Sequence, residues 1–178
     1  MKIDFVRHGQ TYFNIAGKTN GQSMEDSLTE EGIKQAKETL VNISKDYTEI
    51  YSSDLIRTKQ TAEILNKKLN LIIQYDKRLR ERDVGLLTGK FWTEIGKEIK
   101  TIDKNQKYNY RPQGGESVED VKERLFSFIN DMLLNKKNEK ILVVTHGGII
   151  RLLHHLINGE APETIHNASV HEFEFLDN

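Results

Sequence analysis

Two histidines in this sequence follow strongly apolar runs, and each is followed by a glycine. The first run, residues 3–6, leads into Arg7-His8-Gly9, and the second, residues 141–144, leads into Thr145-His146-Gly147. Short apolar runs that end near glycine are typical of buried strands. An isolated Arg-His pair would favour a surface loop, but the repeated pattern makes both histidines candidate site residues.

Three further residues could do chemistry with these histidines. Arg7 lies beside His8, Arg57 follows a strand-like segment, and Glu81 follows a later one. Two arginines suit a phosphoryl group, because a planar guanidinium makes charge-assisted, bidentate bonds to its oxygens. A neutral imidazole is a competent nucleophile, and a nearby carboxyl group could protonate a leaving alkoxide. This set would be complete for phosphoryl transfer through a covalent intermediate.

The composition excludes several other classes of site and protein. The chain has 178 residues, a formal net charge of −1 and no cysteine. One domain, residues 1–178, is expected at this length. The charge gives no sign of a nucleic-acid or membrane partner, and the absence of cysteine removes thiolate catalysis and cysteine metal sites. With no membrane span and no signal peptide expected, a cytoplasmic protein is the default prediction.

The elements that must position these residues alternate along the chain. Apolar runs predict strands at residues 3–6, 50–53, 71–73 and 141–144, with an alternating edge strand at 170–175. Helical spacing predicts helices at 33–43, 54–69, 118–132 and 148–157, and a short one around 95–102 that fades into the polar run 103–107. This alternation indicates an α/β fold: a three-layer α/β/α arrangement whose central sheet is mostly parallel with one antiparallel edge strand.

The remaining segments are read as loops. The polar stretch 10–25 predicts a loop, and either Ser27, with Glu30 in a capping box, or Thr29 would cap the helix that follows.

In open α/β sheets ligands bind outside the carboxyl ends of the strands, so the site should form at that edge. Glu116 and the segment 107–111 could contact a substrate there, but position alone does not decide either role.

The motifs of this chain, taken in order, resemble those of the histidine phosphatase superfamily, also called phosphoglycerate-mutase-like. The resemblance covers nearly the whole chain and rests on these segments: Arg7-His8-Gly9-Gln10-Thr11, Asp26-Ser27-Leu28-Thr29, Ser53-Asp54-Leu55-Ile56-Arg57, Leu79-Arg80-Glu81, Gly115-Glu116-Ser117 and Val144-Thr145-His146-Gly147-Gly148. The first and last segments are specific to this superfamily. The middle segments are weak signals singly, and their order along the chain is what matches the superfamily. Thr58 and Ser27 depart from the usual pattern without touching the expected chemistry.

The resemblance implies a role for each candidate residue. His8 would be the phosphorylated nucleophile, and Glu81 would be the general acid and base. The phosphoryl oxygens would be held by Arg7, Arg57 and His146. Asn14 would lie at the pocket edge, and Gly147 would let the backbone approach the anion. The implied activity is that of a phosphatase acting on a small phosphorylated substrate without metal or cofactor.

Three alternatives stay open at this point. A phosphoglycerate mutase would use the same chemistry, although the short stretch between Glu81 and Pro112 favours hydrolysis, because mutases of this superfamily tend to carry a longer insertion there. A metal-dependent hydrolase lacks any metal-ligand motif. A non-catalytic phosphate-binding module would be expected if His8 or Glu81 were replaced, and both are present. The substrate and the oligomeric state are not legible from the sequence.

Overall fold

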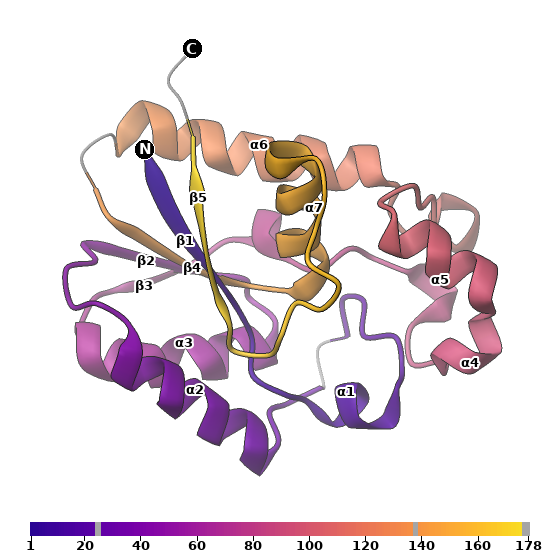
Figure 1. Cartoon of the computed structure of the whole chain (residues 1–178), viewed down its shortest axis with the longest axis horizontal. Helices are drawn as coiled ribbons and strands as arrows, with labels where there is room; N and C mark the ends of the chain where they lie inside the picture. Colours follow the sequence, from indigo (N-terminus) through magenta and orange to yellow (C-terminus); the bar gives the residue numbers. More distant parts are fainter. Residues whose placement is uncertain (24–25, 137–138, 176–178) are drawn as a thin grey trace.

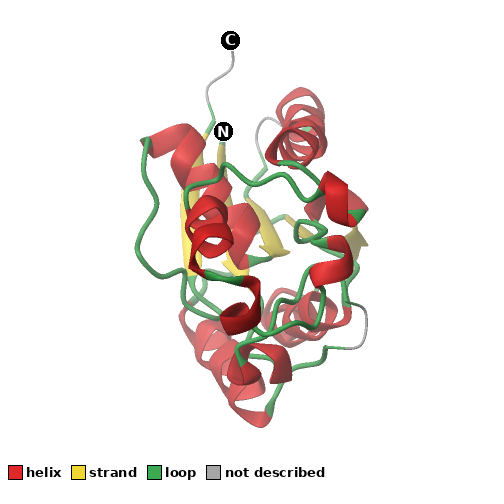
Figure 2. Cartoon of the chain, turned by 90° about the vertical axis from the view of Figure 1, so that its right-hand side faces the viewer, coloured by secondary structure: helices red, strands yellow, loops and turns green. Residues whose placement is uncertain are grey.

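A five-stranded sheet with helices on both faces forms the centre of the computed structural model (Figures 1 and 2), which describes residues 1–23, 26–136 and 139–175. The strands are β1 (Lys2–Arg7), β2 (Glu49–Ser52), β3 (Ile73–Tyr75), β4 (Ile141–Thr145) and β5 (Val170–Glu174). Their order is β3-β2-β4-β1-β5, with β5 antiparallel to β1 and the other pairs parallel. The predicted fold class is confirmed.

Four longer helices cover the sheet and three shorter ones lie near one end of it. The longer helices are α2 (Glu30–Asn42), α3 (Ile56–Leu69), α6 (Val118–Asn135) and α7 (Gly147–Asn158). The shorter ones are α1 (Tyr12–Ala16), α4 (Trp92–Ile95) and α5 (Lys97–Lys104), and single 3-10 turns occur at Lys77–Leu79, Gly85–Leu87 and Arg111–Gln113. In Figure 1, α2 and α3 lie below the sheet, α6 and α7 lie above it, and α4 and α5 lie together at the right.

Alternation along the strands divides the core into two layers. Phe5 of β1 packs in the cluster that includes residues of α6 and α7, whereas the next residue, Val6, packs in the cluster that includes residues of α3. All five residues of β4 are buried, as expected for a central parallel strand covered on both faces. The sheet is therefore a rigid base for the loops at its carboxyl edge.

The pairing of β1 with β4 brings the two motif histidines together. Val6 pairs with Val144 and Arg7 pairs with Thr145 in parallel register. The backbone N–H of His8 then donates to the carbonyl of Thr145 at 3.0 Å. Because parallel strands end at the same edge, His8 and His146 leave the sheet side by side.

The loop after His8 packs directly on the start of α2, and two glycines make this contact possible. A Cβ atom on Gly9 would lie 2.4 Å from the carbonyl oxygen of Gly32, and one on Gly32 would lie 2.1 Å from that of Gln10. Thr29 is the N-cap of α2, accepting from the N–H of Gly32 at 3.0 Å. The capping box expected from Ser27 is therefore wrong, and Thr29 is the cap.

Two sequence predictions near loops need correction. The stretch 10–25, expected to be a loop, contains α1, which Thr11 and Asn14 start with a capping box; residues 24 and 25 lie outside the described part. The third strand begins at Ile73 rather than at residue 71. Asn70 ends α3 in the left-handed conformation, and the side chain of Asn66 binds both backbone polar groups of Leu71, which ties that residue to the helix end.

The predicted short helix around 95–102 is two helices. Gly96 separates α4 from α5, and its φ of 93° is a conformation that glycine adopts easily. The helix α5 continues to Lys104, into the polar run 103–107 where the helix was expected to fade. Asp103 and Gln106 in that run are buried, because their side chains meet polar partners rather than apolar ones.

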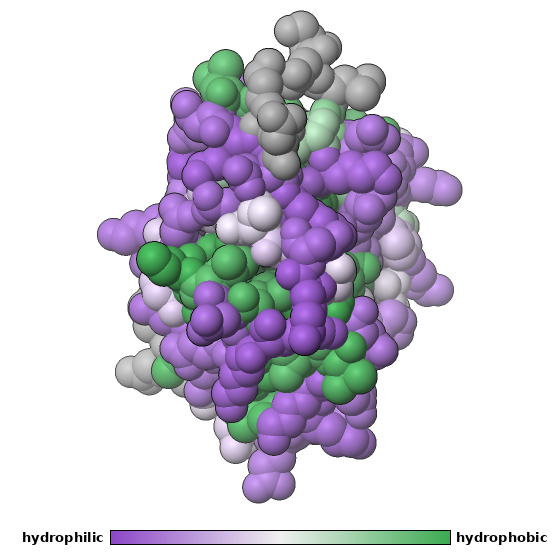
Figure 3. Space-filling model, turned by 90° about the vertical axis from the view of Figure 1, so that its left-hand side faces the viewer, coloured by the Kyte–Doolittle hydropathy of each residue, from purple (hydrophilic) through white to green (hydrophobic). Residues whose placement is uncertain are grey.

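One face of the molecule, on the left-hand side of the view in Figure 1, is mainly polar. Figure 3 shows this side as mainly hydrophilic, with smaller apolar patches. Among the described residues, exposed apolar side chains include Val41, Ile72 and Leu134, which belong to different segments of the chain. None of the described helices is long and apolar enough to cross a membrane.

Candidate active site

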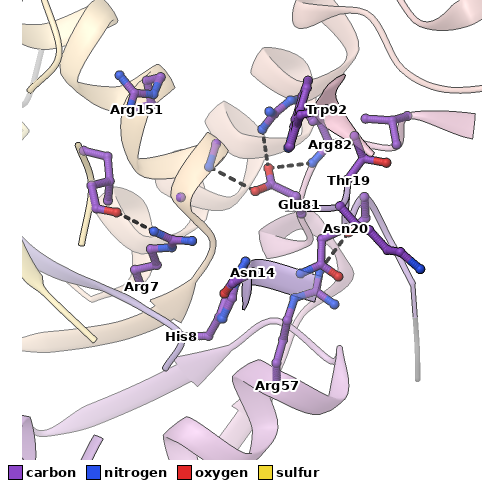
Figure 4. A pocket seen from close by; sticks show the side chains of 16 residues that line it. Arg7, His8, Asn14, Thr19, Asn20, Arg57, Glu81, Arg82, Trp92 and Arg151 are labelled. Carbon is purple, nitrogen blue, oxygen red and sulfur yellow. Dashed lines mark hydrogen bonds and ion pairs between the residues drawn. The ribbon is translucent and has the colours of Figure 1, made fainter. Parts of the chain in front are cut away.

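A cavity of about 200 Å³ lies at the carboxyl edge of the sheet (Figure 4). Six of the seven predicted site residues line it: Arg7, His8, Asn14, Arg57, Glu81 and Gly147. They come from five places in the fold: the end of β1, the helix α1, the start of α3, the loop after β3 and the start of α7. The seventh, His146, lies beneath the cavity wall, with its ring centroid 5.3 Å from that of His8.

Hydrogen bonding fixes the tautomer of His8. Its Nδ1 lies 2.7 Å from the carbonyl oxygen of Gly9, which can only accept, so Nδ1 carries the proton. Nε2 therefore keeps its lone pair. The Gly9 backbone is itself held by the hydroxyl of Thr61, which accepts from its N–H at 3.1 Å. The lone pair of a fixed imidazole is what a nucleophile needs.

The surroundings keep His8 neutral. Its side chain is almost fully buried, and burial lowers the pKa of His8 well below its ordinary value. The positive charges of Arg57 and Arg7 lower the pKa of His8 further, because they disfavour a second cation. The imidazole is therefore unprotonated near pH 7.

Arg57 is fully buried and Arg7 is partly buried, and in the described part of the chain the side-chain hydrogen bonds of both go to backbone carbonyls. Arg57 donates to the carbonyls of Gly21 at 2.7 Å and Ser23 at 2.8 Å, and Arg7 donates to that of Ile165 at 2.5 Å. Burial lowers the pKa of each arginine to about 10, although Glu81 acts in the opposite direction. Both remain charged at neutral pH. The Nε atoms of both are buried without a hydrogen-bond partner in the described structure.

His146 has one satisfied and one unsatisfied ring nitrogen. Its Nε2 lies 2.9 Å from the hydroxyl of Ser53, which also accepts from the N–H of Leu55. When that hydroxyl gives its proton to Nε2, the proton of His146 lies on Nδ1. Nδ1 is buried with no partner among the described residues, and burial, followed by the charge of Arg57, lowers the pKa of His146 well below its usual range.

Glu81 is held in one position by three donors. Its Oε2 accepts from the N–H of Gly148 at 3.0 Å, and its Oε1 accepts from the N–H and Nη1 of Arg82, both at 3.0 Å. Burial raises the pKa of Glu81, but the charge of Arg82 and the two backbone donors outweigh this, so the pKa lies below its ordinary value. Without a ligand the group is a carboxylate.

The glycines at the start of α7 make room for the neighbouring side chains. A Cβ on Gly148 would lie 2.2 Å from Oε1 of Glu81 and 1.8 Å from Nη1 of Arg82. A Cβ on Gly147 would lie 3.1 Å from Nε of Arg7. Gly148 therefore admits the carboxylate, while Gly147 lies against the cationic side of the cavity.

Two segments left open by the sequence do not line the cavity. Glu116 accepts from Nε of Arg124 at 2.8 Å and from the N–H of Asp83 at 2.8 Å, so it supports the loop that carries Glu81. Arg124 reaches the same loop by donating to the carbonyl of Glu81 at 3.2 Å. In segment 107–111, Tyr108 and Tyr110 are buried in the core and stack on each other. Their contribution is to packing.

The match with known proteins is consistent with this geometry. The sequence model of the histidine phosphatase superfamily, branch 1, matches residues 3–178. The chain belongs to the histidine phosphatase superfamily. The resemblance read from its motifs is thereby confirmed.

Relatives of this histidine phosphatase carry phosphatase and mutase names. A metal-independent phosphoserine phosphatase of Arabidopsis thaliana is 32% identical over 99% of this chain and 77% of the relative. Phosphoglycerate mutase-like protein 4 of the same plant is 34% identical over 99% and 80%. A mycobacterial glucosyl-3-phosphoglycerate phosphatase solved with VO3 has a TM-score of 0.86 at 25% identity, covering 96% of this chain and 90% of its own. These relatives support phosphatase activity, the predicted enzyme class.

Several cavity residues of the histidine phosphatase were not anticipated from the sequence. They are Lys18, Thr19, Asn20, Arg82, Trp92 and Arg151. Arg151 lies one helical turn after Gly147 on α7, a spacing that could have pointed to it. Lys18 and Trp92 lie in segments without a motif. In the described ranges, no group of three or more His, Cys, Asp or Glu side chains is arranged to hold a metal ion.

The two glycines of α7 give a matched pair of variants. Gly148→Ala should displace Glu81 and lower kcat strongly, roughly 10²- to 10⁴-fold if proton transfer is lost. Gly147→Ala should instead weaken binding of inorganic phosphate, because its Cβ presses on Arg7. Both variants gain helix propensity equally. Steady-state kinetics and calorimetric phosphate titration measure the two effects, and equal losses of binding in both variants would contradict this geometry.

Proposed function

We propose that this enzyme hydrolyses a phosphomonoester through a phosphohistidine on His8, with Glu81 as general acid and then base. The observation that carries the proposal is a set of unpaired buried polar atoms around a neutral imidazole. Nε of Arg7, Nε of Arg57 and Nδ1 of His146 have no partner in the described residues. Buried polar groups are normally satisfied, so an oxyanion is the ligand that would complete them.

The two chemical steps follow from the positions of His8 and Glu81. In the first step Nε2 of His8 attacks phosphorus, the bond to the leaving oxygen breaks, and Glu81 gives its proton to that oxygen. In the second step water attacks phosphorus, Glu81 takes a proton from the water, and the P–N bond returns its electrons to the imidazole. The arginines stabilise the charge on the phosphoryl oxygens throughout.

The depressed pKa of Glu81 is compatible with an acid role once substrate is bound. In the empty site the carboxylate form is favoured by Arg82 and by the N–H of Gly148. A phosphoryl dianion placed beside it is a like charge and disfavours the ionised form. Substrate binding would therefore raise the pKa of Glu81 toward the range where it can donate.

Hydrolysis is favoured over transfer by the short segment that covers the cavity. Between Glu81 and Pro112 the chain provides only α4, α5 and two turns as cover. A shallow cover admits water to the phosphoenzyme. With 3-phosphoglycerate we therefore expect phosphate release and no isomerisation stimulated by a bisphosphorylated cofactor, whereas efficient isomerisation would favour the mutase alternative.

The charge of the cavity supports a substrate with a second anionic group. Five cationic side chains line it, against one carboxylate, that of Glu81: Arg7, Lys18, Arg57, Arg82 and Arg151. Among the described residues, Arg151 donates to the carbonyls of Pro162 and Glu163 and to no carboxylate, and Lys18 lies over the rings of Phe13 and Phe91. A phosphoryl dianion leaves much of this charge uncompensated. Phosphoserine and glucosyl-3-phosphoglycerate, which appear in the names of relatives, both carry such a group as a carboxylate.

The first prediction from this proposal concerns Glu81. Glu81→Gln keeps the shape and removes the proton, so turnover of an alkyl phosphate should fall roughly 10²- to 10⁴-fold. An aryl phosphate, whose phenolate leaves unaided, should still give a burst of product in the presence of a chelator. Rapid-quench kinetics distinguishes the two substrates. Equal losses for both, without a burst, would mean that Glu81 only shapes the cavity.

A second prediction concerns Arg151 and uses two substrates of similar size. The enzyme should prefer 3-phosphoglycerate to glycerol 3-phosphate, and Arg151→Met should reduce this preference roughly 10- to 100-fold, the value of a charged hydrogen bond. The ratio of kcat/KM values measures the effect. Arg111→Met, an exposed arginine away from the cavity, is the control. A preference that survives Arg151→Met would exclude Arg151 as the second anion site.

A further inference from the structure

Asp103 is a buried acid that lies behind the wall of the cavity. It is near the end of α5 and is not among the residues that line the cavity. Its carboxylate accepts from Nε of Arg82 at 2.7 Å, from Nη2 of Arg82 at 2.5 Å and from the hydroxyl of Tyr110 at 2.7 Å. Its side chain is 10% exposed, so this contact is shielded from solvent.

Arg82 joins this acid to Glu81. Two of its guanidinium nitrogens face Asp103, and the third, Nη1, donates to Oε1 of Glu81 (Figure 4). The bidentate contact fixes the plane of the guanidinium, and with it the direction in which Nη1 points. The other oxygen of Glu81 is fixed by the N–H of Gly148. A continuous chain of contacts thus runs from the hydroxyl of Tyr110 to the start of α7.

A single cation shared by two carboxylates acts differently from a cation paired with one. If Arg82 faced Glu81 alone, its full charge would favour the ionised form of Glu81. The negative charge of Asp103 offsets part of this effect and competes for the same guanidinium. The second acid therefore sets how readily Glu81 takes up a proton.

We propose that Asp103 is a positioning residue for the acid–base group: it holds Arg82 so that one nitrogen supports Glu81, and it limits how strongly Arg82 favours the ionised carboxylate. The inference rests on the proposed role of Glu81 and adds a residue from α5 to it. The segment from α4 to α5 then has two connections to the cavity, through Trp92 in its wall and through Asp103 behind Glu81.

The other charged groups around Glu81 do not replace the effect of Asp103 on its protonation. The cations near it come from β1, α3, α6 and α7: Arg7, Arg57, Arg124 and Arg151. Tyr108, over whose ring the guanidinium of Arg82 lies, is a further titratable neighbour, and burial raises its pKa above the ordinary range. Among these groups, Asp103 is the acid that binds the same guanidinium as Glu81. The charges of Asp103 and Glu81 also outweigh burial and raise the pKa of Arg82 well above its usual value, so Arg82 stays charged.

The test is Asp103→Asn, which keeps the shape and one oxygen acceptor but removes the charge. We expect the Glu81 carboxyl, followed by carbon-13 NMR with inorganic phosphate bound, to titrate roughly one pH unit lower than in the unchanged enzyme. For an alkyl phosphate, the fall of kcat at high pH should shift in the same direction. The burst rate with an aryl phosphate should not change. Asp103→Glu should return the fall of kcat at high pH to its position in the unchanged enzyme.

The control is Asp131→Asn, which removes an acidic partner of Arg78 away from the cavity and should shift neither readout. An unchanged or higher titration point in Asp103→Asn would overturn the proposal, as would an equal loss at every pH for both substrates. If this variant does not fold, a double variant that carries both Arg82→Met and Asp103→Met removes both charges and keeps side chains of similar volume. The Glu81 titration should then shift upward, and an unchanged value would overturn the proposal.

The carboxyl titration is measured without turnover, so it separates the two proposals. If Glu81→Gln behaves as expected and Asp103→Asn shifts nothing, only the role of Asp103 fails. If Asp103→Asn shifts the titration but Glu81→Gln leaves the leaving-group dependence unchanged, the acid role fails while the coupling of Asp103 to Glu81 stands.

Discussion

The rest of the site depends on two guanidinium groups, those of Arg7 and Arg57, which no carboxylate of the described residues contacts. Arg57 is fully buried and Arg7 is partly buried, and the side-chain hydrogen bonds they make go to carbonyl oxygens. Burying a charge is costly unless it is paired. Backbone carbonyls supply only partial negative charge, so the site holds positive charge that a bound anion would compensate. Burial lowers the pKa of His8 and the same positive charge lowers it further, so the imidazole is neutral and its lone pair is available.

The cations lie at the edge of a sheet whose central strand is buried. The sheet is buried on both faces, and its central strand β4 is apolar throughout its length apart from Thr145. Thr145 at the end of that strand holds the carbonyl of Leu79, which anchors the loop leading to Glu81. The guanidinium of Arg57 reaches back to the loop at Gly21 and Ser23. Charge and loop geometry thus stabilise each other.

Much of the fold and of the site could be predicted from the sequence, for definite physical reasons. Strands β1 and β4 are apolar runs that end at glycine motifs, so His8, Arg7 and His146 could be placed before any coordinates were known. The order of parallel strands then brought Arg57 and Glu81 to the same edge. The family comparison confirms the resemblance on which their roles were predicted, and the roles themselves remain proposals.

What could not be predicted depends on contacts between segments distant in sequence. Asp103 lies in the polar run into which the short helix was expected to fade, yet it is buried because Arg82 and Tyr110 meet it there. Arg151 and Lys18 have no motif, and only the packing of α7 and of the loop after α1 brings them to the cavity. Glu116 was undecided because an acid before a helix is favourable for local reasons, and its partner Arg124 is seen only in the fold.

The central claim is that His8 carries the phosphoryl group during turnover, and direct detection of that intermediate tests it. An alkali-stable phosphohistidine should appear when the enzyme is mixed with an aryl phosphate, quenched in base and digested for peptide mass spectrometry. The account predicts phosphate on the peptide that contains His8, at higher occupancy in Glu81→Gln and absent from His8→Ala. Phosphate on another residue, or turnover that persists in His8→Ala, would contradict it.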